Sequence, residues 1–499
     1  MRLSQLLESV TVSKLFQTMY GRMVVTHEVE IGKVQYDSRK IQRSDCFVAI
    51  KGTASDGHTF IQSAINQGAH VVVLQDDTIL PDSLCMHAGV IKVVVPDYRK
   101  ALAIIAANYF GHPSRKLKFV GITGTNGKTT TSHLVKTILE AGGEKVGLVG
   151  TIEYKIGDQI IPATHTTPES LELNELFAVM VENNCTSVSM EVSSHALDQS
   201  RVYGVDFDVA VFTNLTQDHL DYHVTMEHYF EAKKILFTDL KPSNCSVINI
   251  DDQWGVKLLG SIKAKKISYG INLAADIFAK EIKLSINGTT FVVSNGQREC
   301  TVSTPLIGKF NVYNVLAAYT TGEALGLPQE QILSGIKELK NVRGRFERIA
   351  SPAGWTAIVD YAHTPDALEN CLKTIHDVLP KNNRGHIITV FGAGGDRDKT
   401  KRPLMGRIAG DYSDMVIVTS DNPRTEEPET IMDDVLRGIT RHASVLREVD
   451  RRTAIERAIK GAQRGDVILI AGKGHEDYQI IGKEKKHFSD CEVVENLLK

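Results

Sequence analysis

Short apolar runs alternate with segments of helical periodicity along most of the chain, which is the pattern of an α/β protein. The clearest example lies between residues 118 and 143. An apolar, β-rich run opens this stretch, a glycine-bearing loop follows, and Leu134, Val135, Ile138 and Leu139 then recur at helix spacing. The pattern predicts a buried strand, a loop, and a helix whose apolar face packs against a sheet.

The same alternation predicts three α/β domains in this chain of 499 residues. Residues 1–97 form a small α/β domain, and residues 98–343 form a central domain with a largely parallel sheet covered on both faces. Residues 344–499 have a Rossmann-like layout, because each predicted strand ends in a polar loop. The charged, glycine-bearing segment 341–347 is a natural hinge before this last domain.

Composition narrows the class of protein. Apolar residues make up 42% and charged residues 23% of the chain, as in soluble globular proteins. The net charge of −3 argues against a nucleic-acid-binding surface. The seven cysteines are scattered without a Cys-x-x-Cys pair, so they read as reduced thiols and not as disulfides or zinc ligands. No signal peptide or membrane span is evident, and we expect a cytoplasmic protein.

The sequence GTNGKTT, residues 124–130, fills the loop between the predicted strand and helix. Glycines let backbone N–H groups close around phosphate oxygens, a lysine offsets their charge, and a threonine hydroxyl can hold Mg²⁺. The strict P-loop pattern fails, because its first glycine would fall at Ile122, so this is a variant loop. The alternative is a glycine-rich turn before a surface helix. We predict an ATP site formed by Gly124, Thr125, Asn126, Gly127, Lys128, Thr129 and Thr130.

Acidic and histidine side chains follow two further predicted strands. Glu191 ends the apolar run 187–192, where a P-loop domain places a partner of Mg²⁺, although a solvated glutamate is the alternative. Residues 214–223 hold two histidines and two aspartates, but their spacing fits no zinc template. We take His219 as a metal ligand and His223 as structural. On charge statistics alone, the lysines of the next predicted helix face solvent.

The polar loops of the last domain suggest an amino-acid site. Arg397 and Arg424 offer planar forks for carboxylates, and Asp421 and Glu476 offer anions for an ammonium group. This set complements an amino acid with an additional charged end; the alternative is a proline-containing turn with a surface arginine. The loop GAGGDRD, residues 392–398, is no dinucleotide fingerprint, because its third glycine is misplaced.

Taken together, the segments GTNGKTT, HTTPES, MEVSSHAL, NLTQDHLDYH and FEAKKILF resemble the ATP-dependent Mur ligases of peptidoglycan synthesis. The resemblance covers essentially the whole chain. The sequence DNPR, residues 421–424, is similar to the motif of those members that add meso-2,6-diaminopimelate to UDP-N-acetylmuramoyl-L-alanyl-D-glutamate. The resemblance implies a cytoplasmic, monomeric ligase of cell-wall synthesis, and hence of cell shape and division. It would form an acyl phosphate from ATP with Mg²⁺ and use small-molecule substrates only.

The resemblance also implies roles for single residues. Lys233 matches a lysine that CO₂ converts to a carbamate, and Lys128, Lys233 and His219 would be catalytic. Metal ligands would be Thr129, Glu191, His219 and Lys233. Nucleotide contacts would be Asn311, Arg345 and Asp360, although helix capping is an equal explanation for Asn311 and Asn314. The nucleotide-sugar dipeptide would contact Ser38, Thr166, Thr167, Ser193, Gln199 and Arg201. Diaminopimelate would contact Arg397, Asp421, Asn422, Pro423, Arg424, Gly472 and Glu476.

Taken alone, Ser38 reads as part of an ordinary Asp-Ser turn. Three rival functions stay open. A lysine-adding ligase of the same family would lack the arginine of DNPR. A folylpolyglutamate synthase shares the phosphate loop and the domain plan but fits the uridine-side loop and the DNPR pocket poorly. A regulatory or transport ATPase with a P-loop would hydrolyse ATP without an amino-acid acceptor.

Overall fold

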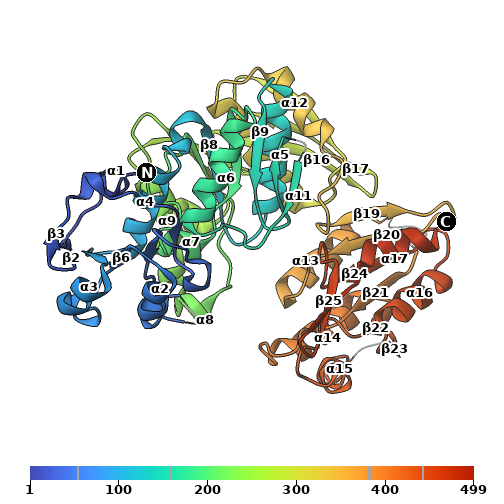
Figure 1. Cartoon of the computed structure of the whole chain (residues 1–499). Helices are drawn as coiled ribbons and strands as arrows, with labels where there is room; N and C mark the ends of the chain where they lie inside the picture. Colours follow the sequence, from blue (N-terminus) through green and yellow to red (C-terminus); the bar gives the residue numbers. More distant parts are fainter. Residues whose placement is uncertain (53–54, 158, 273, 380–384, 441–442, 499) are drawn as a thin grey trace. The chain divides into compact units, whose positions relative to one another are not determined.

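The computed structural model describes residues 1–52, 55–157, 159–272, 274–379, 385–440 and 443–498. The chain forms two compact units (Figure 1). The first comprises Met1–Tyr269 with Ala317–Ile332, and the second comprises Gly270–Leu316 with Leu333–Lys499. The three-domain division at residues 97 and 343 stays a prediction, whereas the α/β class is confirmed.

A five-stranded sheet lies near the N-terminus, in the order β1-β7-β6-β5-β4. Its strands are β1 (Lys14–Phe16), β4 (Val34–Gln35), β5 (Cys46–Val48), β6 (Val71–Leu74) and β7 (Ile91–Val94). Strands β4 to β7 run parallel, and β1 pairs antiparallel with β7. The connecting helices are α2 (Ile61–Gln67) and α3 (Asp82–Ala88), and α4 (Tyr98–Tyr109) follows the sheet. Every residue of β6 is buried, as expected for an apolar run in a parallel sheet.

The main sheet of the first unit has a parallel centre. In the order β9-β12-β8-β13-β14-β15, its parallel strands are Val146–Val149, Ser187–Glu191, Lys118–Thr123, Val209–Phe212, Cys245–Asn249 and Lys265–Gly270. Two antiparallel strands, β10 (Glu153–Ile156) and β11 (Gln159–Pro162), extend it beyond β9. Its helices include α5 (Lys128–Ala141), α6 (Ser170–Glu182), α7 (Ser194–Asp198), α8 (Leu220–His223) and α9 (Met226–Thr238). The strand, loop and helix predicted for residues 118–143 are therefore present.

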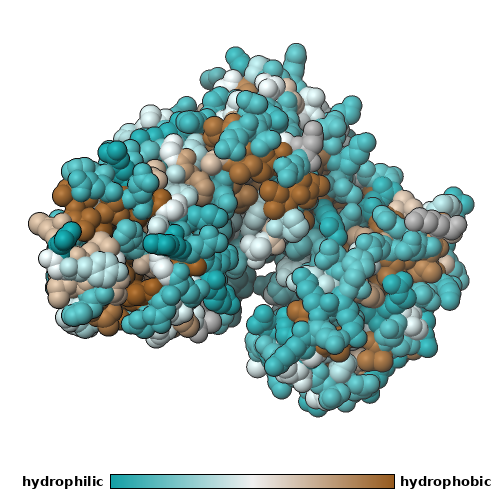
Figure 2. Space-filling view, viewed as in Figure 1, coloured by the Kyte–Doolittle hydropathy of each residue, from teal (hydrophilic) through white to brown (hydrophobic). Residues whose placement is uncertain are grey.

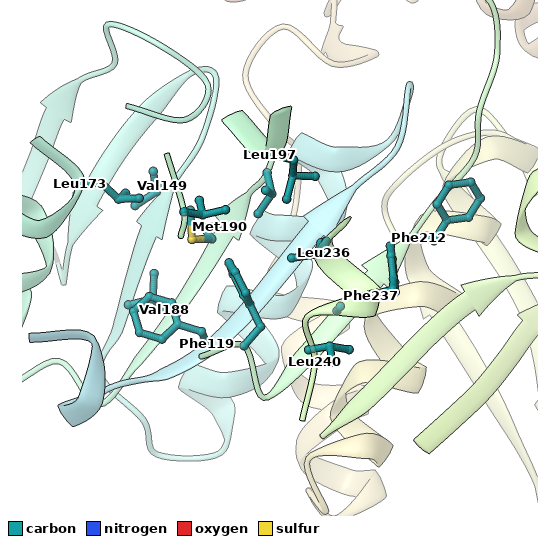
Figure 3. Close-up of a cluster of buried hydrophobic side chains, with 14 of the residues drawn as sticks. Phe119, Val149, Leu173, Val188, Met190, Leu197, Phe212, Leu236, Phe237 and Leu240 are labelled. Atoms are coloured by element: carbon teal, nitrogen blue, oxygen red, sulfur yellow. The ribbon is translucent and has the colours of Figure 1, made fainter. Parts of the chain in front are cut away.

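A cluster of large apolar side chains fills the space between this sheet and helices α6, α7 and α9 (Figure 3). Phe119 of β8 meets Phe177 of α6 edge to face, with ring centroids 4.8 Å apart. Phe212 of β13 packs in the same way on Phe237 of α9, at 6.3 Å. Such ring pairs add to the free energy gained from apolar burial. This packing fixes the ends of β8, β12 and β13, where the polar loops begin.

The second unit contains a six-stranded sheet in the order β19-β20-β24-β21-β22-β23. Its strands are Glu347–Ala350, Thr356–Asp360, Val467–Ala471, Ile387–Phe391, Met415–Val418 and Ser444–Arg447, and all except β19 are parallel to their neighbours. Alternate residues face opposite cores. In β24, Val467, Leu469 and Ala471 pack with helices α13 (Pro365–Val378), α14 (Lys401–Tyr412) and α15 (Pro428–Leu436). Ile468 and Ile470 pack with α16 (Arg451–Gly461) and α17 (Asp490–Leu497).

Two features differ from the sequence-based expectations. Strands β16 (Ile277–Ser285), β17 (Gly288–Ser294) and β18 (Glu299–Thr304) form an antiparallel meander inside the region expected to be largely parallel. Helix α11 (Lys309–Ala324) begins before Asn311, so Asn311 and Asn314 lie within it, and the capping alternative is wrong. Helix α12 (Gln329–Glu338) follows it.

Most residues on the face shown in Figure 2 are hydrophilic, and the apolar ones lie in smaller groups. None of the helices formed by the described residues has the length and apolar character needed to cross a bilayer. All seven cysteines fall within the described residues and are free thiols.

Candidate active site

Two glycines give the phosphate loop its shape. The loop joins β8 to α5, and Gly124 and Gly127 adopt positive φ angles of 148° and 86°. A Cβ atom on Gly124 would lie 1.9 Å from Thr213 Oγ1, so no larger residue fits there. Glycine is needed at both positions because L side chains rarely adopt these angles. The backbone therefore has the tight turn at a helix N-terminus that an anion site requires.

The neighbouring strand end holds this loop in place. Asn214 accepts hydrogen bonds from Thr125 N through its carbonyl oxygen and from Asn126 N through Oδ1, both at 2.9 Å. Lys128 Nζ donates to the carbonyl oxygens of Gly124 (2.8 Å) and Thr125 (2.7 Å). The amine thus lies over the loop, where a phosphate would meet it. The sequence analysis did not select Asn214 as a site residue, although its position directly after a buried strand could have indicated one.

Glu191, at the end of β12, is fully buried and holds three oxygen-bearing side chains together. Its Oε2 accepts hydrogen bonds from Thr129 Oγ1 and Thr151 Oγ1, each at 3.0 Å. Its Oε1 accepts from Thr151 N at 2.8 Å, and Thr151 Oγ1 lies 3.0 Å from Thr166 Oγ1. The alternative of a solvated glutamate is wrong. Sequence reasoning missed Thr151, although it follows the buried strand β9 closely.

Lys233 does not face solvent, contrary to the expectation from charge statistics. Its side chain is 2% exposed, and Nζ donates to the carbonyl oxygen of Gly124 at 2.8 Å. Nζ also lies 4.6 Å from the centre of the Tyr229 ring. Burial, and next the charge of Lys128, hold the pKa of Lys233 well below its ordinary value. Burial therefore favours the neutral form of this amine more than it would for an exposed lysine.

Three histidines gather beside Lys233. The rings of His219 and His195 are 5.0 Å apart, and His223 stacks on Tyr229 at 5.0 Å. His223 Nε2 lies 2.9 Å from Ser194 Oγ, which suits a structural role. Burial lowers the pKa of all three, that of His195 to about 4. Among the described residues, no group of three or more His, Cys, Asp or Glu side chains is placed to hold a metal ion.

Four of the residues assigned to the nucleotide-sugar dipeptide contact one another. Thr167 Oγ1 donates to Glu191 O at 2.9 Å and accepts from Ser193 N at 3.1 Å. Arg201 donates to Thr167 O at 2.9 Å and to Gln199 Oε1 at 2.7 Å. The two segments HTTPES and SSHALDQSR are thereby joined at the end of β12. Thr166 reaches the same place through Thr151.

Ser38 lies in the small N-terminal sheet region, in a short 3₁₀ helix that spans Ser38–Lys40. Asp37 caps this turn by accepting from Arg39 N at 3.0 Å, so the local structure is the ordinary Asp-Ser turn. The adjacent Tyr36 donates from its hydroxyl to Glu172 Oε1 of α6 at 2.6 Å. Tyr36 therefore links the Asp-Ser turn to the central part of the first unit.

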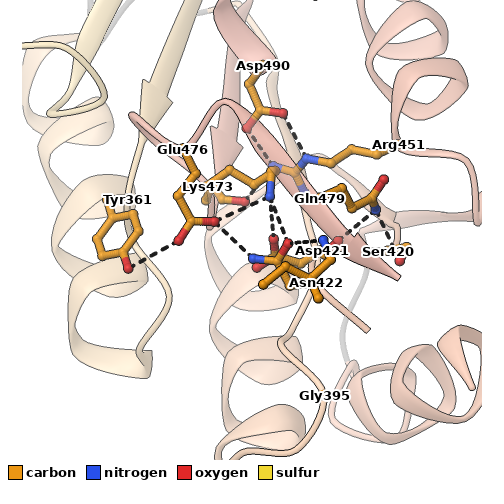
Figure 4. A network of polar contacts seen from close by, with 12 residues as sticks. Tyr361, Gly395, Ser420, Asp421, Asn422, Arg451, Lys473, Glu476, Gln479 and Asp490 are labelled. Atoms are coloured by element: carbon orange, nitrogen blue, oxygen red, sulfur yellow. Dashed lines mark hydrogen bonds and ion pairs between the residues drawn. The ribbon is translucent and has the colours of Figure 1, made fainter. Parts of the chain in front are cut away.

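In the second unit, the loops after β22 and β24 form a polar network (Figure 4). Asn422 Nδ2 donates to Glu476 Oε2 at 2.9 Å. Lys473 Nζ lies 3.4 Å from Asp421 Oδ1 and from Glu476 Oε2. Gly472 has a φ of 116°, and a Cβ on it would lie 3.2 Å from Asp421 Oδ2. The structure thus gathers four of the residues predicted for the amino acid, together with Lys473, which the sequence analysis missed.

Arg424 follows Pro423 and is held by backbone contacts. Its φ is 53°, and its Nη1 donates to Gly395 O at 2.7 Å. A Cβ on Gly394 would lie 3.1 Å from Arg424 Nη1 and 3.8 Å from Arg397 Cγ. Both predicted arginines therefore border the same glycine, and Arg397 is exposed. The guanidinium groups complement carboxylates.

The remaining predicted nucleotide contacts also lie in the second unit. Asn311 and Arg345 line a cavity of about 840 Å³, and the Arg345 guanidinium lies 5.1 Å from the Tyr361 ring centre. Asp360 Oδ2 accepts from Phe346 N at 2.6 Å, and burial raises the pKa of Asp360.

Three family models match the chain in order. The Mur ligase family catalytic domain matches residues 30–110, the Mur ligase middle domain matches residues 122–322, and the Mur ligase glutamate ligase domain matches residues 344–474.

Several similar proteins carry the same name. A UDP-N-acetylmuramoyl-L-alanyl-D-glutamate--2,6-diaminopimelate ligase of Clostridium botulinum is 44% identical over 98% of this chain and 100% of its own length. The same-named ligase of Caldanaerobacter subterraneus is 47% identical over 94% of this chain and 95% of its own. A solved structure of that name has a TM-score of 0.69 at 33% identity and covers 97% of this chain and 98% of its own. The chain therefore belongs to the Mur ligase family of ATP-dependent ligases.

Proposed function

We propose that the protein adds 2,6-diaminopimelate to UDP-N-acetylmuramoyl-L-alanyl-D-glutamate at the expense of ATP. The observation that carries this proposal is the acceptor pocket, in which Arg424 and Arg397 border one glycine while Asp421, Asn422 and Glu476 share a polar network. An amino acid with a second carboxylate and a second ammonium complements these charges. The names of the similar proteins support the same substrates.

Residues of the phosphate loop would bind ATP. Lys128 Nζ lies against the loop carbonyl oxygens, and its fixed positive charge would stabilise the transferring phosphoryl group. A glutamyl carboxylate oxygen of the dipeptide attacks the γ-phosphorus, which yields ADP and an acyl phosphate. Asn311, Arg345 and Asp360 are proposed to contact the remainder of the nucleotide.

The residues around Glu191 fit a magnesium ion. Thr129 Oγ1 and the Glu191 carboxylate are oxygen donors 3.0 Å apart, and Mg²⁺ prefers oxygen ligands. Thr129 is proposed to hold one Mg²⁺ ion, and Glu191 and His219 are proposed to hold a second. Bound Mg²⁺ would neutralise charge on the phosphates during transfer.

We further propose that Lys233 is a carbamate in the active enzyme. Burial lowers its pKa and so favours the neutral amine, whose nitrogen can attack CO₂, form an N–C bond and release a proton. The product carries two oxygens where the unmodified side chain has an ammonium, which suits a ligand of Mg²⁺. Incubation with ¹³C-bicarbonate should give a carbamate carbon signal that Lys233→Ala lacks; a signal of equal size in the variant would reject the assignment.

Binding of the nucleotide-sugar dipeptide is assigned to two regions of the first unit. Ser38 would contact the uridine, and the linked residues Thr167, Ser193, Gln199 and Arg201, together with Thr166, would hold the sugar, pyrophosphate and peptide. The acyl phosphate is then attacked by a neutral amine of diaminopimelate. The amide bond forms, inorganic phosphate leaves, and the proton of the amine passes to solvent.

We also propose that the enzyme is a cytoplasmic monomer. The absence of a membrane-spanning helix among the described residues is compatible with this location. Sedimentation at several protein concentrations tests the monomer, and a mass above 55.0 kDa that rises with concentration would reject it.

The experiment that tests the function is phosphate release with ATP, Mg²⁺ and the nucleotide-sugar dipeptide, comparing meso-diaminopimelate with L-lysine. Turnover with diaminopimelate alone is expected, because lysine lacks the distal carboxylate and would leave Arg424 unpaired. Turnover with L-lysine instead would be consistent with the ligase reaction but would reject diaminopimelate as the acceptor.

A further inference from the structure

Lys473, labelled in Figure 4, has no role in the proposed function, and its side chain is 0% exposed. It directly follows Gly472 at the end of β24. Its Nζ donates to Asp421 Oδ1 (3.4 Å), Asn422 Oδ1 (3.2 Å) and Glu476 Oε2 (3.4 Å). An ammonium group so completely removed from water must be matched by hydrogen-bond acceptors. The three side chains that accept from Lys473 all belong to the proposed diaminopimelate pocket.

Lys473 fixes the orientation of the Asn422 amide. Asn422 Oδ1 accepts from Lys473 Nζ at 3.2 Å and from Ile480 N at 2.9 Å. Both of these partners are donors only, so the oxygen and not the nitrogen of the amide must face them. The amide nitrogen is left to donate to Glu476 Oε2 at 2.9 Å.

The two oxygens of Glu476 consequently have different surroundings. Oε2 accepts from both Lys473 and Asn422. Oε1 faces the hydroxyl of Tyr361 at 3.5 Å, the outer limit of a hydrogen bond. The carboxylates of Asp421 and Glu476 both pair with the ammonium of Lys473.

A second buried ion pair fixes the backbone next to Lys473. Arg451 donates to both oxygens of Asp490, at 2.8 and 2.7 Å, and both side chains are 0% exposed. Arg451 Nη2 also donates to Ala471 O at 3.1 Å. The end of β24 is thereby tied to helices α16 and α17, two residues before Lys473 (Figure 4).

We propose that Lys473 is a positioning residue that sets selectivity for the acceptor. By holding Glu476 Oε2 and the Asn422 amide, it directs Glu476 Oε1 toward the ammonium group of diaminopimelate that does not react. This inference rests on the proposed function, because it requires diaminopimelate to lie in this pocket. Arg424 then recognises the distal carboxylate, while Lys473, acting through Glu476, governs recognition of the distal ammonium.

Two analogues separate these roles. 2-Aminopimelate keeps the distal carboxylate but lacks the distal amine, and L-lysine keeps a distal amine but lacks the distal carboxylate. The experiment measures kcat/KM for all three acceptors in the wild type, Lys473→Met and Arg424→Ala. Lys473→Met should reduce the preference for diaminopimelate over 2-aminopimelate at least tenfold, through a higher KM for diaminopimelate, with the KM for ATP within twofold of wild type.

The matched control is Lys486→Met, which removes an exposed lysine of β26 (Glu484–His487) in the same unit. It should leave every ratio unchanged. An unchanged preference over 2-aminopimelate in Lys473→Met overturns the inference. Arg424→Ala tests the proposed pocket separately: if its preference for diaminopimelate over lysine equals that of the wild type, the pocket assignment fails whatever Lys473→Met shows.

Lys473→Met leaves the buried Asp421 and the partly buried Glu476 without the ammonium group that pairs with them, and this variant can fail to fold. The double variant Lys473→Met/Glu476→Gln removes one charge of each sign and serves as the second test. If Lys473 acts through Glu476, the double variant and Glu476→Gln alone should prefer diaminopimelate over 2-aminopimelate to the same extent, within twofold. A further loss of more than fivefold in the double variant would show that Lys473 does not act through Glu476 and would overturn the inference.

Discussion

The amine of Lys128 lies 2.8 Å and 2.7 Å from two carbonyl oxygens of the phosphate loop, so it is already in place before a phosphate arrives. Lys128→Ala should lower kcat by about 10²- to 10³-fold, because one preorganised charge on the transferring group is lost. Phosphate release at saturating ATP measures the effect. Lys136→Ala, later on the same helix, is the control, and a loss below tenfold for Lys128→Ala would contradict this role.

His475 makes the stability of the second unit sensitive to acid. Burial, and next Arg345 and Arg343, lower its pKa to about 3. In the unfolded chain the pKa is about 6.5, so below that pH only the unfolded state takes up the proton. The free energy of unfolding should therefore fall by about 2 kcal/mol between pH 7 and pH 5 and continue to fall toward pH 3.

The variant His475→Gln should lack this part of the acid sensitivity, whatever its stability at pH 7. Urea unfolding at pH 7 and pH 5 measures the difference, and Trp355, buried in the same unit, reports it by fluorescence. The exposed His27 supplies the control His27→Gln, which should keep the wild-type pH dependence. An equal pH dependence in His475→Gln and wild type would reject the explanation.

Single residues show what the sequence can and cannot predict about the site. Lys128, Glu191 and Arg424 follow predicted strands or loops, and local pattern sufficed to select them. Lys233 did not stand out, because a lysine on an amphipathic helix faces solvent unless a distant segment covers it. The segment that covers it is the phosphate loop, more than 100 residues earlier in the chain. Lys473 and Thr151 were missed for the same reason: their partners are distant in sequence.

At the scale of elements, Gly344 should be the least replaceable residue of the segment that begins the C-terminal sheet. Its φ is 65°, and an added Cβ would lie 2.0 Å from His475 N and 2.3 Å from Gly474 C. Gly344→Ala should destabilise the protein by more than about 2 kcal/mol, since backbone strain adds to the collision.

Gly461, the last residue of helix α16, supplies the contrast. No atom lies within 4 Å of its added Cβ, so Gly461→Ala should stabilise by about 0.5 kcal/mol. Urea unfolding of both variants is the measurement. Equal midpoints for the two would contradict the difference in local geometry.

Elements with strong periodicity were predictable and others were not. The buried strands β6, β12 and β24 can be recognised in the sequence as apolar runs between polar loops. The antiparallel meander β16–β18 was not predicted, because the direction in which these strands pair depends on their neighbours in the fold. The start of α11 was misplaced because Asn311 and Asn314 resemble capping residues, whereas Asn311 Nδ2 donates to Ile307 O, one turn earlier.

At the scale of the whole molecule, the proposed sites for the two substrates lie in different units. Phosphate release should require both substrates together, because the acyl phosphate forms on the nucleotide-sugar dipeptide and is consumed by attack of diaminopimelate. Omission of either substrate should reduce release to background. Release that is independent of both would indicate a simple ATPase, the rival that the phosphate loop alone leaves open.

The alternation of side chains in β24 has a consequence for how the protein can vary between species. The side chains of the five residues Val467 to Ala471 pack alternately into two hydrophobic cores. Gly472 and Lys473, in the loop of the proposed diaminopimelate pocket, follow directly. Exchange among valine, isoleucine and leucine preserves this arrangement, but one inserted or deleted residue would swap the two faces and turn the loop away. Homologues should therefore differ freely in the identity of these apolar residues and hardly at all in their number.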